Sequence, residues 1–197
     1  MTNLLERLRQ ETRPLHEQTE QLFYTKALKN GTLSVAEYSH LLQTHLVFHQ
    51  ALESAIDRNE EFFRDYEPEV RRKTPWLLAD LAHLPQALPV PMPELFADWS
   101  PVSLLGAAYV GEGSMLGGSV IGRMLQQNEA IKPLVAQGRF YQGYGSALGN
   151  NWKKFGAFLT QQGTPYADAV VAAADETFSV YQSIFLANRA AVLSRVV

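Results

Sequence analysis

The sequence predicts an all-α protein, and three observations support this. Apolar residues recur at intervals of three and four along most of the chain, which is the spacing of one helix face. Several of these runs follow a serine or threonine suited to an N-cap, with a proline or glutamate close behind. No segment shows the alternation of a half-buried strand. Because there is no internal repeat and no interdomain linker, we expect a single domain over residues 1–197.

The first helical pattern begins near the N-terminus and ends at Asn30-Gly31, where a glycine favours a helix stop. Pro14 lies inside this pattern, so we expect a kink or the start of a new helical segment there. Ser34 and Glu37 form a capping box, which predicts a second helix that runs to about Asp57. The inward positions of the first pattern are Leu5, Leu8, Thr12, Leu15, Thr19 and Leu22.

The later elements follow from similar signals. Ser100 and Pro101 suit an N-cap and a first-turn proline, which predicts the start of a long helix. In chain order we expect a short helix over 68–84, a proline-rich loop over 85–101, the long helix to about Gln127, a glycine- and tyrosine-rich loop over 140–149, a helix over 151–161, and a last helix from Thr164-Pro165 through Ser194.

The long helix contains an unusual run of glycines. Residues 109–123 read Tyr-Val-Gly-Glu-Gly-Ser-Met-Leu-Gly-Gly-Ser-Val-Ile-Gly-Arg. Each glycine inside a helix costs about 1 kcal/mol relative to alanine, so this run requires a physical reason. One reason is a flat or bulky group that presses on the backbone, where any Cβ would collide. Close packing of two helices is the alternative, and it stays open. The glycines lie at positions 111, 113, 117, 118 and 122.

Other interpretations of the glycine run fit less well. A dinucleotide-binding loop needs G-x-G-x-x-G after a strand, whereas the spacing here is G-x-G-x-x-x-G and no strand is expected before it. A membrane-type contact through G-x-x-x-G needs a continuous apolar stretch, which Glu112 and Arg123 interrupt.

Composition excludes several functional classes. The net charge of -3 gives no basic stripe, so we expect no nucleic-acid partner. The absence of cysteine excludes disulfides, thiolate zinc sites and iron–sulfur clusters. Because there is no signal-peptide pattern and no segment of membrane-spanning length, we expect a cytoplasmic protein with no membrane partner.

Two histidine constellations are candidate metal ligands. His16 lies beside the apolar stripe of the first helix, and Glu20 follows it by one turn. A carboxylate at this spacing can accept the imidazole Nδ1 proton and leave Nε2 free to bind a metal. His45, His49 and Glu53 share a face of the second helix and could bind a non-haem metal. We find no complementary Glu-x-x-His pair on a facing helix, so we interpret that face as solvated or as facing another subunit.

The N-terminal segment with His16 and the glycine-rich helix together resemble the haem oxygenases, in particular the bacterial type. Residues 8–20, Leu-Arg-Gln-Glu-Thr-Arg-Pro-Leu-His-Glu-Gln-Thr-Glu, are similar to the family's proximal segment, in which the histidine binds the haem iron. Residues 109–118 are similar to the bacterial form of its distal helix. Weaker similarities occur at 72–81, 152–155 and 174–178, so the resemblance covers nearly the whole chain.

The resemblance implies a helical fold that sandwiches haem b between the first helix and the glycine-rich distal helix. It implies oxidative cleavage of haem to biliverdin with release of CO and ferrous iron, using O2 and electrons from a ferredoxin, flavodoxin or reductase. His16 would be the iron ligand, oriented by Glu20, and the distal face would comprise Gly113, Ser114, Gly117 and Gly118. Ser114 replaces the aspartate that organises distal water in mammalian relatives. The candidates for binding the haem propionates are Arg9, Arg13, Tyr109, and Lys153 or Lys154.

Two alternatives stay open. A haem carrier or sensor would keep the same ligand and the same glycine helix without turning haem over. A non-haem di-iron oxidase of similar architecture would need additional ligands beside His45, His49 and Glu53. The thiaminase-type relatives depend on a cysteine nucleophile, which this chain lacks.

Overall fold

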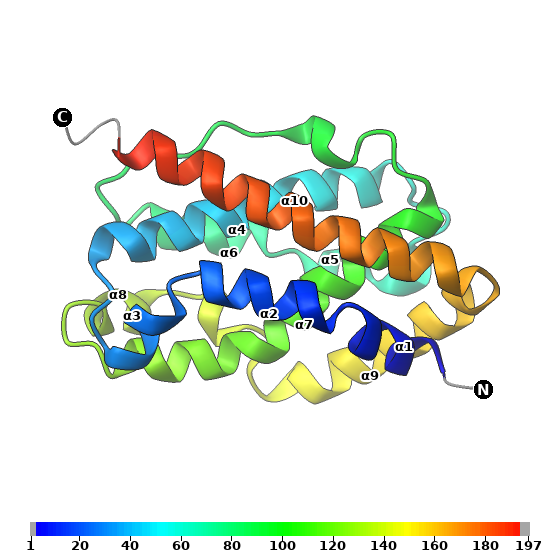
Figure 1. Ribbon diagram of the computed structural model, residues 1–197, viewed down its shortest axis with the longest axis horizontal. Coiled ribbons are helices and arrows are strands. Elements are labelled where there is room, and N and C mark those ends of the chain that lie inside the picture. The colour runs from blue at the N-terminus through cyan, green and yellow to red at the C-terminus, as the bar shows by residue number, and fades with distance from the viewer. Residues whose placement is uncertain (1–2, 194–197) are drawn as a thin grey trace.

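A computed structural model describes residues 3–193, with side chains as far as residue 189. Throughout these residues the chain forms helices joined by turns and loops, which confirms the all-α prediction (Figure 1). Three long helices form the frame: α4 (Val35–Asp57), α7 (Pro101–Gln126) and α10 (Ala167–Leu193). Helix α10 crosses the molecule and packs against both α7 and α4 (Figure 1).

The N-terminal helical pattern is divided at two points. Helix α1 (Leu4–Glu11) ends at Thr12, and Pro14 lies in the first turn of α2 (Arg13–Leu22), as the proline predicted. The expectation that the pattern continues to Asn30 is wrong, because Tyr24 adopts a left-handed conformation with φ 58°. A new helix, α3 (Thr25–Asn30), follows and ends at Gly31.

Other boundaries agree with the sequence or differ for identifiable reasons. The predicted capping box of α4 is present, with both reciprocal hydrogen bonds between Ser34 and Glu37. The helix expected over 68–84 is split into α5 (Pro68–Arg71) and α6 (Thr74–Leu81). Arg72 is extended there, and Pro75 suits only a first helical turn.

The C-terminal half follows the predicted order with small additions. Helix α9 (Leu148–Gly163) is longer than expected, and α8 (Lys132–Gln137) was not predicted. The last helix begins after a short turn at 164–166, and its expected end at Ser194 lies outside the described residues. The short 3-10 turns are η1 (Arg64–Tyr66), η2 (Pro93–Phe96), η3 (Phe140–Gln142), η4 (Gly145–Ala147) and η5 (Thr164–Tyr166).

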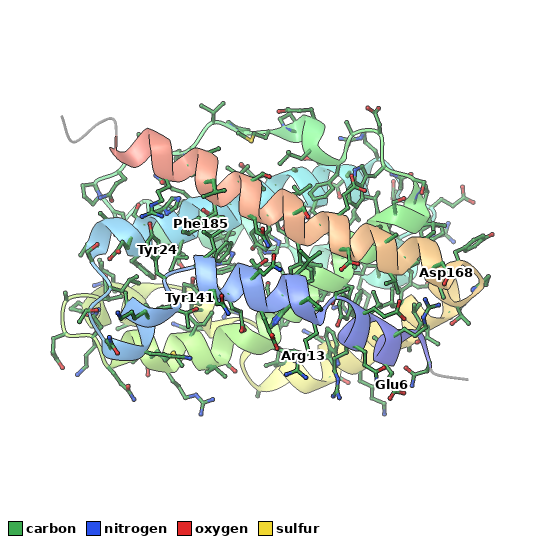
Figure 2. The ribbon with its side chains drawn as sticks, in the orientation of Figure 1. Glu6, Arg13, Tyr24, Tyr141, Asp168 and Phe185 are labelled. Atoms are coloured by element: carbon green, nitrogen blue, oxygen red, sulfur yellow. The ribbon has the colours of Figure 1, made fainter. Side chains whose placement is uncertain are left out.

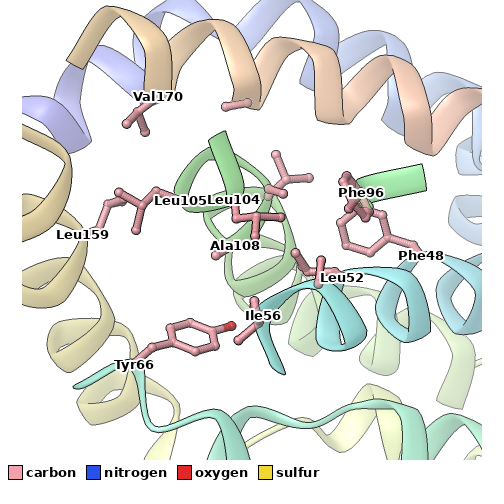
Figure 3. Packing of buried hydrophobic residues seen from close by; sticks show 14 of the residues in the cluster. Phe48, Leu52, Ile56, Tyr66, Phe96, Leu104, Leu105, Ala108, Leu159 and Val170 are labelled. Atoms are coloured by element: carbon pink, nitrogen blue, oxygen red, sulfur yellow. The ribbon is translucent and has the colours of Figure 1, made fainter. Parts of the chain in front are cut away.

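The N-terminal half of α7 lies in the main core. Leu104, Leu105 and Ala108 are buried between α4, α9 and α10 (Figure 3). Gly106 lies so close to α10 that a Cβ built on it would be 2.6 Å from backbone atoms of Val170 and Ala174. This half of α7 is therefore held tightly on several sides. Among the described residues, no helix is long and apolar enough to cross a membrane.

Candidate functional site

Two of the predicted glycines on α7 are explained by helix packing. A Cβ at Gly111 would lie 3.2 Å from the side chain of Leu52 on α4. A Cβ at Gly122 would lie 3.1 Å from the carbonyl oxygen of Tyr141. Both distances are tighter than ordinary contacts, so these two glycines allow neighbouring segments to approach the helix. The helix-packing interpretation is correct for this part of the run.

The other three glycines are not explained by contacts within the protein. A Cβ built at Gly113, Gly117 or Gly118 would meet no atom of another segment within 4 Å. None of the three has the positive φ that would require glycine. Their cost in helix propensity, about 1 kcal/mol each, is therefore not offset by packing. The surface they create is a backbone cradle with room for a group that a Cβ would obstruct.

Helix α2 carries His16 and packs against α10. The α1–α2 junction lies near α7, because the Thr12 hydroxyl and the Arg9 charge both lower the pKa of Tyr109, which burial raises. Helix α3, which follows α2, packs against α7 as well. The segments on both sides of α2 therefore lie near α7, while α2 itself packs against α10.

The His16 ring is accessible and is not held by a hydrogen bond. Its side chain is 53% exposed, and its edge lies against Phe178 of α10 at 5.7 Å between ring centroids. Glu20 is the expected neighbour one turn later, but the nearer ring nitrogen is Nε2, at 3.7 Å from the carboxylate. The predicted Nδ1 bond is thus not formed here. An exposed ring without a hydrogen bond can turn about its Cβ–Cγ bond, which exchanges the two nitrogens.

The predicted propionate-binding residues are only partly brought together. Burial raises the pKa of Tyr109, whereas the Thr12 hydroxyl and the charge of Arg9 lower it, so Arg9 is within electrostatic range of the phenol. Arg13 is exposed and pairs with Glu17 at 2.7 Å. Figure 2 shows Arg13 on the side of α2 that is turned away from α10.

The two lysines of α9 differ from one another. Lys154 pairs with Glu67 at 3.0 Å. Lys153 is exposed and lines a shallow groove between α1 and α9 together with Leu5 and Trp152. Trp152 lies 6.2 Å from Tyr109 between ring centroids, so the groove adjoins the Arg9–Tyr109 pair. Lys153 is therefore near the predicted propionate side, whereas Lys154 is already engaged.

Ser114 is hydrogen-bonded within its own helix. Its Oγ donates to the Gly111 carbonyl oxygen at 2.7 Å. The hydroxyl oxygen keeps its acceptor lone pairs on a half-buried part of α7. It can therefore accept a hydrogen bond from a water molecule without losing its bond to the helix.

The interpretation of the α4 histidine face as solvated or intersubunit is wrong. His45 and His49 are buried, and Glu53 is mostly covered by the start of α6. His45 is hydrogen-bonded to the hydroxyls of Tyr181 and Tyr141. Burial lowers the pKa of His45 to about 3, so the ring is neutral at physiological pH. The sequence did not reveal this, because the aromatic residues that cover α4 come from distant segments.

His49 has an unpartnered nitrogen beside a small cavity. Its Nε2 atom is buried and has no hydrogen-bond partner. The cavity is about the size of one water molecule and is also lined by Gly111, Tyr66 and Lys73. Burial lowers the pKa of His49 well below its ordinary value, and the Lys73 ammonium adds to this effect.

The α4 constellation does not assemble as a metal site. Glu53 accepts the backbone N–H groups of Lys73 and Thr74, at 2.6 and 3.2 Å. His45 is engaged by two tyrosines. Within residues 3–193, no group of three or more histidine and acidic side chains is placed to hold a metal ion. The geometry therefore does not favour the di-iron alternative.

A second functional element, absent from the sequence predictions, is centred on Glu112. This carboxylate is buried in α7 and accepts a hydrogen bond from Arg71 at 2.7 Å and one from the Lys73 ammonium. The hydroxyls of Tyr144 and Tyr66 donate to it as well, at 3.0 and 3.2 Å. No local pattern connects these residues, since the partners lie 32 to 46 positions away in the chain.

Comparison with known proteins identifies a matching family and several structures with a similar fold. A model of the family described as heme oxygenase matches residues 2–187. The heme oxygenase of Leptospira interrogans superposes with a TM-score of 0.76 at 16% identity, over 93% of this chain and 98% of that one. The enzyme of Neisseria meningitidis, solved with NO and CO bound, gives 0.73 at 21%, over 95% and 92%.

Heme oxygenase-2 of Synechocystis, in complex with heme and NO, gives a TM-score of 0.75 at 17% identity, over 99% of this chain and 88% of that one. At such identities the likeness establishes the fold alone. A search of the curated proteins gave no significant match.

Proposed function

The chain belongs to the haem oxygenase family, and on that premise we propose that it cleaves haem to biliverdin, releasing CO and ferrous iron. O2 and electrons from an external donor protein (a ferredoxin, flavodoxin or reductase) complete the reaction. The observation that carries the proposal is the cradle on α7: three helical glycines face space that no protein side chain fills. A flat macrocycle is the kind of group that such a backbone surface accommodates.

When bound, haem b supplies the iron at which O2 is activated and the ring that is opened. His16 would hold the haem iron, because its ring is accessible and the segments on both sides of α2 lie near α7. Its neutral ring must offer one nitrogen to the iron and direct the other to Glu20, which is one turn away. Rotation of the ring from the orientation in the structure provides that arrangement.

On the opposite face, Gly113 and Gly117 allow the ring plane to approach the α7 backbone. A helix backbone this close to the ring would restrict the space on that face of the haem. Ser114 accepts a hydrogen bond from a water molecule at the edge of this space. Gly118, one turn beyond Ser114, keeps the same surface free of side chains.

The haem propionates are proposed to lie toward Arg9 and Tyr109. A guanidinium and a phenol can both donate hydrogen bonds to a carboxylate. Lys153 borders the adjoining groove and can contribute charge, and Arg13 can do so once it leaves Glu17. This side of the molecule would set the rotation of haem in its plane, and thereby the biliverdin isomer.

The proposal is tested by titrating the purified apoprotein with hemin and then adding a reductant in air with catalase present. A saturable one-to-one Soret band that decays into a broad red bilin absorbance supports the oxygenase. A stable Soret band under the same conditions would indicate a haem carrier or sensor instead, and the absence of a saturable band would overturn the proposal.

A further inference from the structure

Glu112 is the point at which α7 is most firmly tied to the rest of the protein near the cradle. The side chain lies between Gly111 and Gly113 in the sequence and is 2% exposed. Its donors come from three separate segments: Tyr66 in η1, Arg71 and Lys73 around the α5–α6 junction, and Tyr144 before η4. A single carboxylate therefore connects α7 to three elements at once.

Arg71 extends these connections. Its guanidinium donates to the Tyr66 carbonyl oxygen at 2.5 Å and to the Asn151 carbonyl oxygen at 3.1 Å, the latter at the start of α9. Lys73 is held in turn by Glu53, which accepts its backbone N–H at 2.6 Å. The donors of Glu112 are thus anchored independently of α7, so that they define a fixed position for the carboxylate.

The buried charges of Arg71 and Lys73 disfavour any other position of the Glu112 carboxylate. Arg71 and Lys73 are buried cations, and burial lowers the pKa of the Lys73 ammonium while Glu112 opposes that shift. Moving Glu112 away would leave both cations buried without their nearest anion, which is strongly unfavourable. A buried hydrogen-bonded network of this kind allows few alternative arrangements. Helix α7 can therefore neither slide nor rotate appreciably at Glu112.

The residues on either side of Glu112 differ sharply. Towards the N-terminus, Gly106 contacts the α10 backbone directly and Gly111 contacts α4. Towards the C-terminus, Gly113, Gly117 and Gly118 have open space beside them. Glu112 is the last tightly held residue before the open segment begins.

We propose that Glu112 is a positioning residue: its buried contacts with Arg71, Lys73 and Tyr144 set the height and rotation of Gly113 over the haem face and mark the start of the segment of α7 whose glycines face open space. The part of this inference that concerns haem rests on the proposed function. The part that concerns α7 applies to the apoprotein alone, so the two can fail separately.

The test compares two variants with a matched control. Tyr144→Phe removes one donor to Glu112 and leaves every charge paired and the ring packing in place. Glu112→Gln removes the anion itself. Tyr24→Phe is the control, because it also deletes one tyrosine hydrogen bond (2.9 Å, to His40) but lies away from Glu112.

Amide hydrogen exchange of the apoprotein is the first readout. Tyr144→Phe should accelerate exchange over residues 113–119 about tenfold, as expected for the loss of a hydrogen bond to a charged group. Exchange in α4 and α10 should be unchanged, and Tyr24→Phe should leave residues 113–119 as in the parent. Glu112→Gln, where it folds, should give a larger local effect.

Binding is the second readout. Both Tyr144→Phe and Glu112→Gln should bind hemin several-fold more weakly than the parent and, when turned over, yield a changed ratio of biliverdin isomers. A purely structural role for Glu112 predicts instead that exchange accelerates evenly over all helices and that the isomer ratio of the folded fraction stays the same. Unchanged exchange over residues 113–119 in Tyr144→Phe would overturn the inference, even if Glu112→Gln does not fold. If the parent itself fails to bind hemin, the proposed function fails and the exchange measurement still decides the role of Glu112.

Discussion

Replacing Gly113 and Gly117 together by alanine should make the apoprotein more stable and a poorer binder of hemin. Both positions lie inside α7 with ordinary helical φ, and a Cβ at either meets no other segment within 4 Å. Alanine is favoured over glycine in a helix interior by about 1 kcal/mol, so the double variant should gain about 2 kcal/mol. For a chain of this size that corresponds to a rise of about 4–8 °C in Tm.

The same two methyl groups would stand on the surface that haem is proposed to contact. Hemin should therefore bind more weakly to the double variant than to the parent, although the variant is the more stable protein. The experiment needs thermal unfolding of the apoproteins and hemin titrations by Soret absorbance. A higher Tm of the apoprotein together with a lower affinity for hemin would indicate that these glycines serve ligand binding and are not needed for the fold.

Gly106→Ala is the matched control, since it makes the same chemical change in the same helix. Its Cβ would lie 2.6 Å from the backbone of α10, so α7 and α10 would have to separate. We expect destabilisation by about 1–3 kcal/mol, as for other overpacked sites. If the Gly113/Gly117 double variant is also destabilised, the space beside the cradle is closed in solution and the reasoning is refuted. If its hemin affinity equals that of the parent, the cradle does not face hemin.

Three further predictions concern single residues. His16→Ala should hardly change apoprotein stability, because the ring is half exposed, yet it should abolish the histidine-ligated ferric spectrum; added imidazole should restore much of it, and an unaltered spectrum would place the ligand elsewhere. Arg9→Ala should change the biliverdin isomer ratio, measured by chromatography, more than Arg13→Ala, whose parent side chain is already paired with Glu17; equal effects would contradict the assignment of Arg9. The folded pKa of His45 is about 3, against 6.5 for an unperturbed histidine, so the unfolded chain takes up the proton first, and this contribution to stability is complete above pH 6.5 and is lost as the pH falls towards 3. Between pH 7 and pH 5 the parent should lose about 2 kcal/mol more than His45→Gln in urea unfolding, and parallel pH profiles would show that His45 is not buried neutral.

Local signals in the sequence were sufficient for most of the fold. The capping box at Ser34 and Glu37, the first-turn prolines and the helical periodicity depend on residues a few positions apart, and all of them are present in the structure. The break at Tyr24 and the split before Pro75 were missed, because each depends on a backbone conformation that the neighbouring residues favour only weakly.

Site residues could be proposed from the sequence only where they belong to local patterns, and these assignments stay predictions. The pairing of His16 with Glu20 lies within one helical turn, and Arg9 and Tyr109 belong to the two motifs that carried the family resemblance. The burial of His45 and the partners of Glu112 were not predictable, because they depend on contacts across 32 to 136 residues. An isolated acidic residue in a glycine-rich helix gives no indication in the sequence that two cations approach it.

The glycines of α7 show why a residue type cannot be assigned one role from sequence. Gly106 was not among the five that seemed to need a reason, yet it is the one most strictly required by the fold, because α10 lies against its backbone. Gly113, Gly117 and Gly118 are those that the fold does not require. Their cost in stability is tolerable because the preceding half of α7 is held by Gly106 and by the buried contacts of Glu112. Because α7 is held before these glycines by Glu112 and after them at Gly122, it can carry a run of weak positions beside a ligand and still keep the first of them in place. Weakening the contacts of Glu112 should therefore weaken hemin binding at Gly117 and Gly118, which Glu112 does not contact.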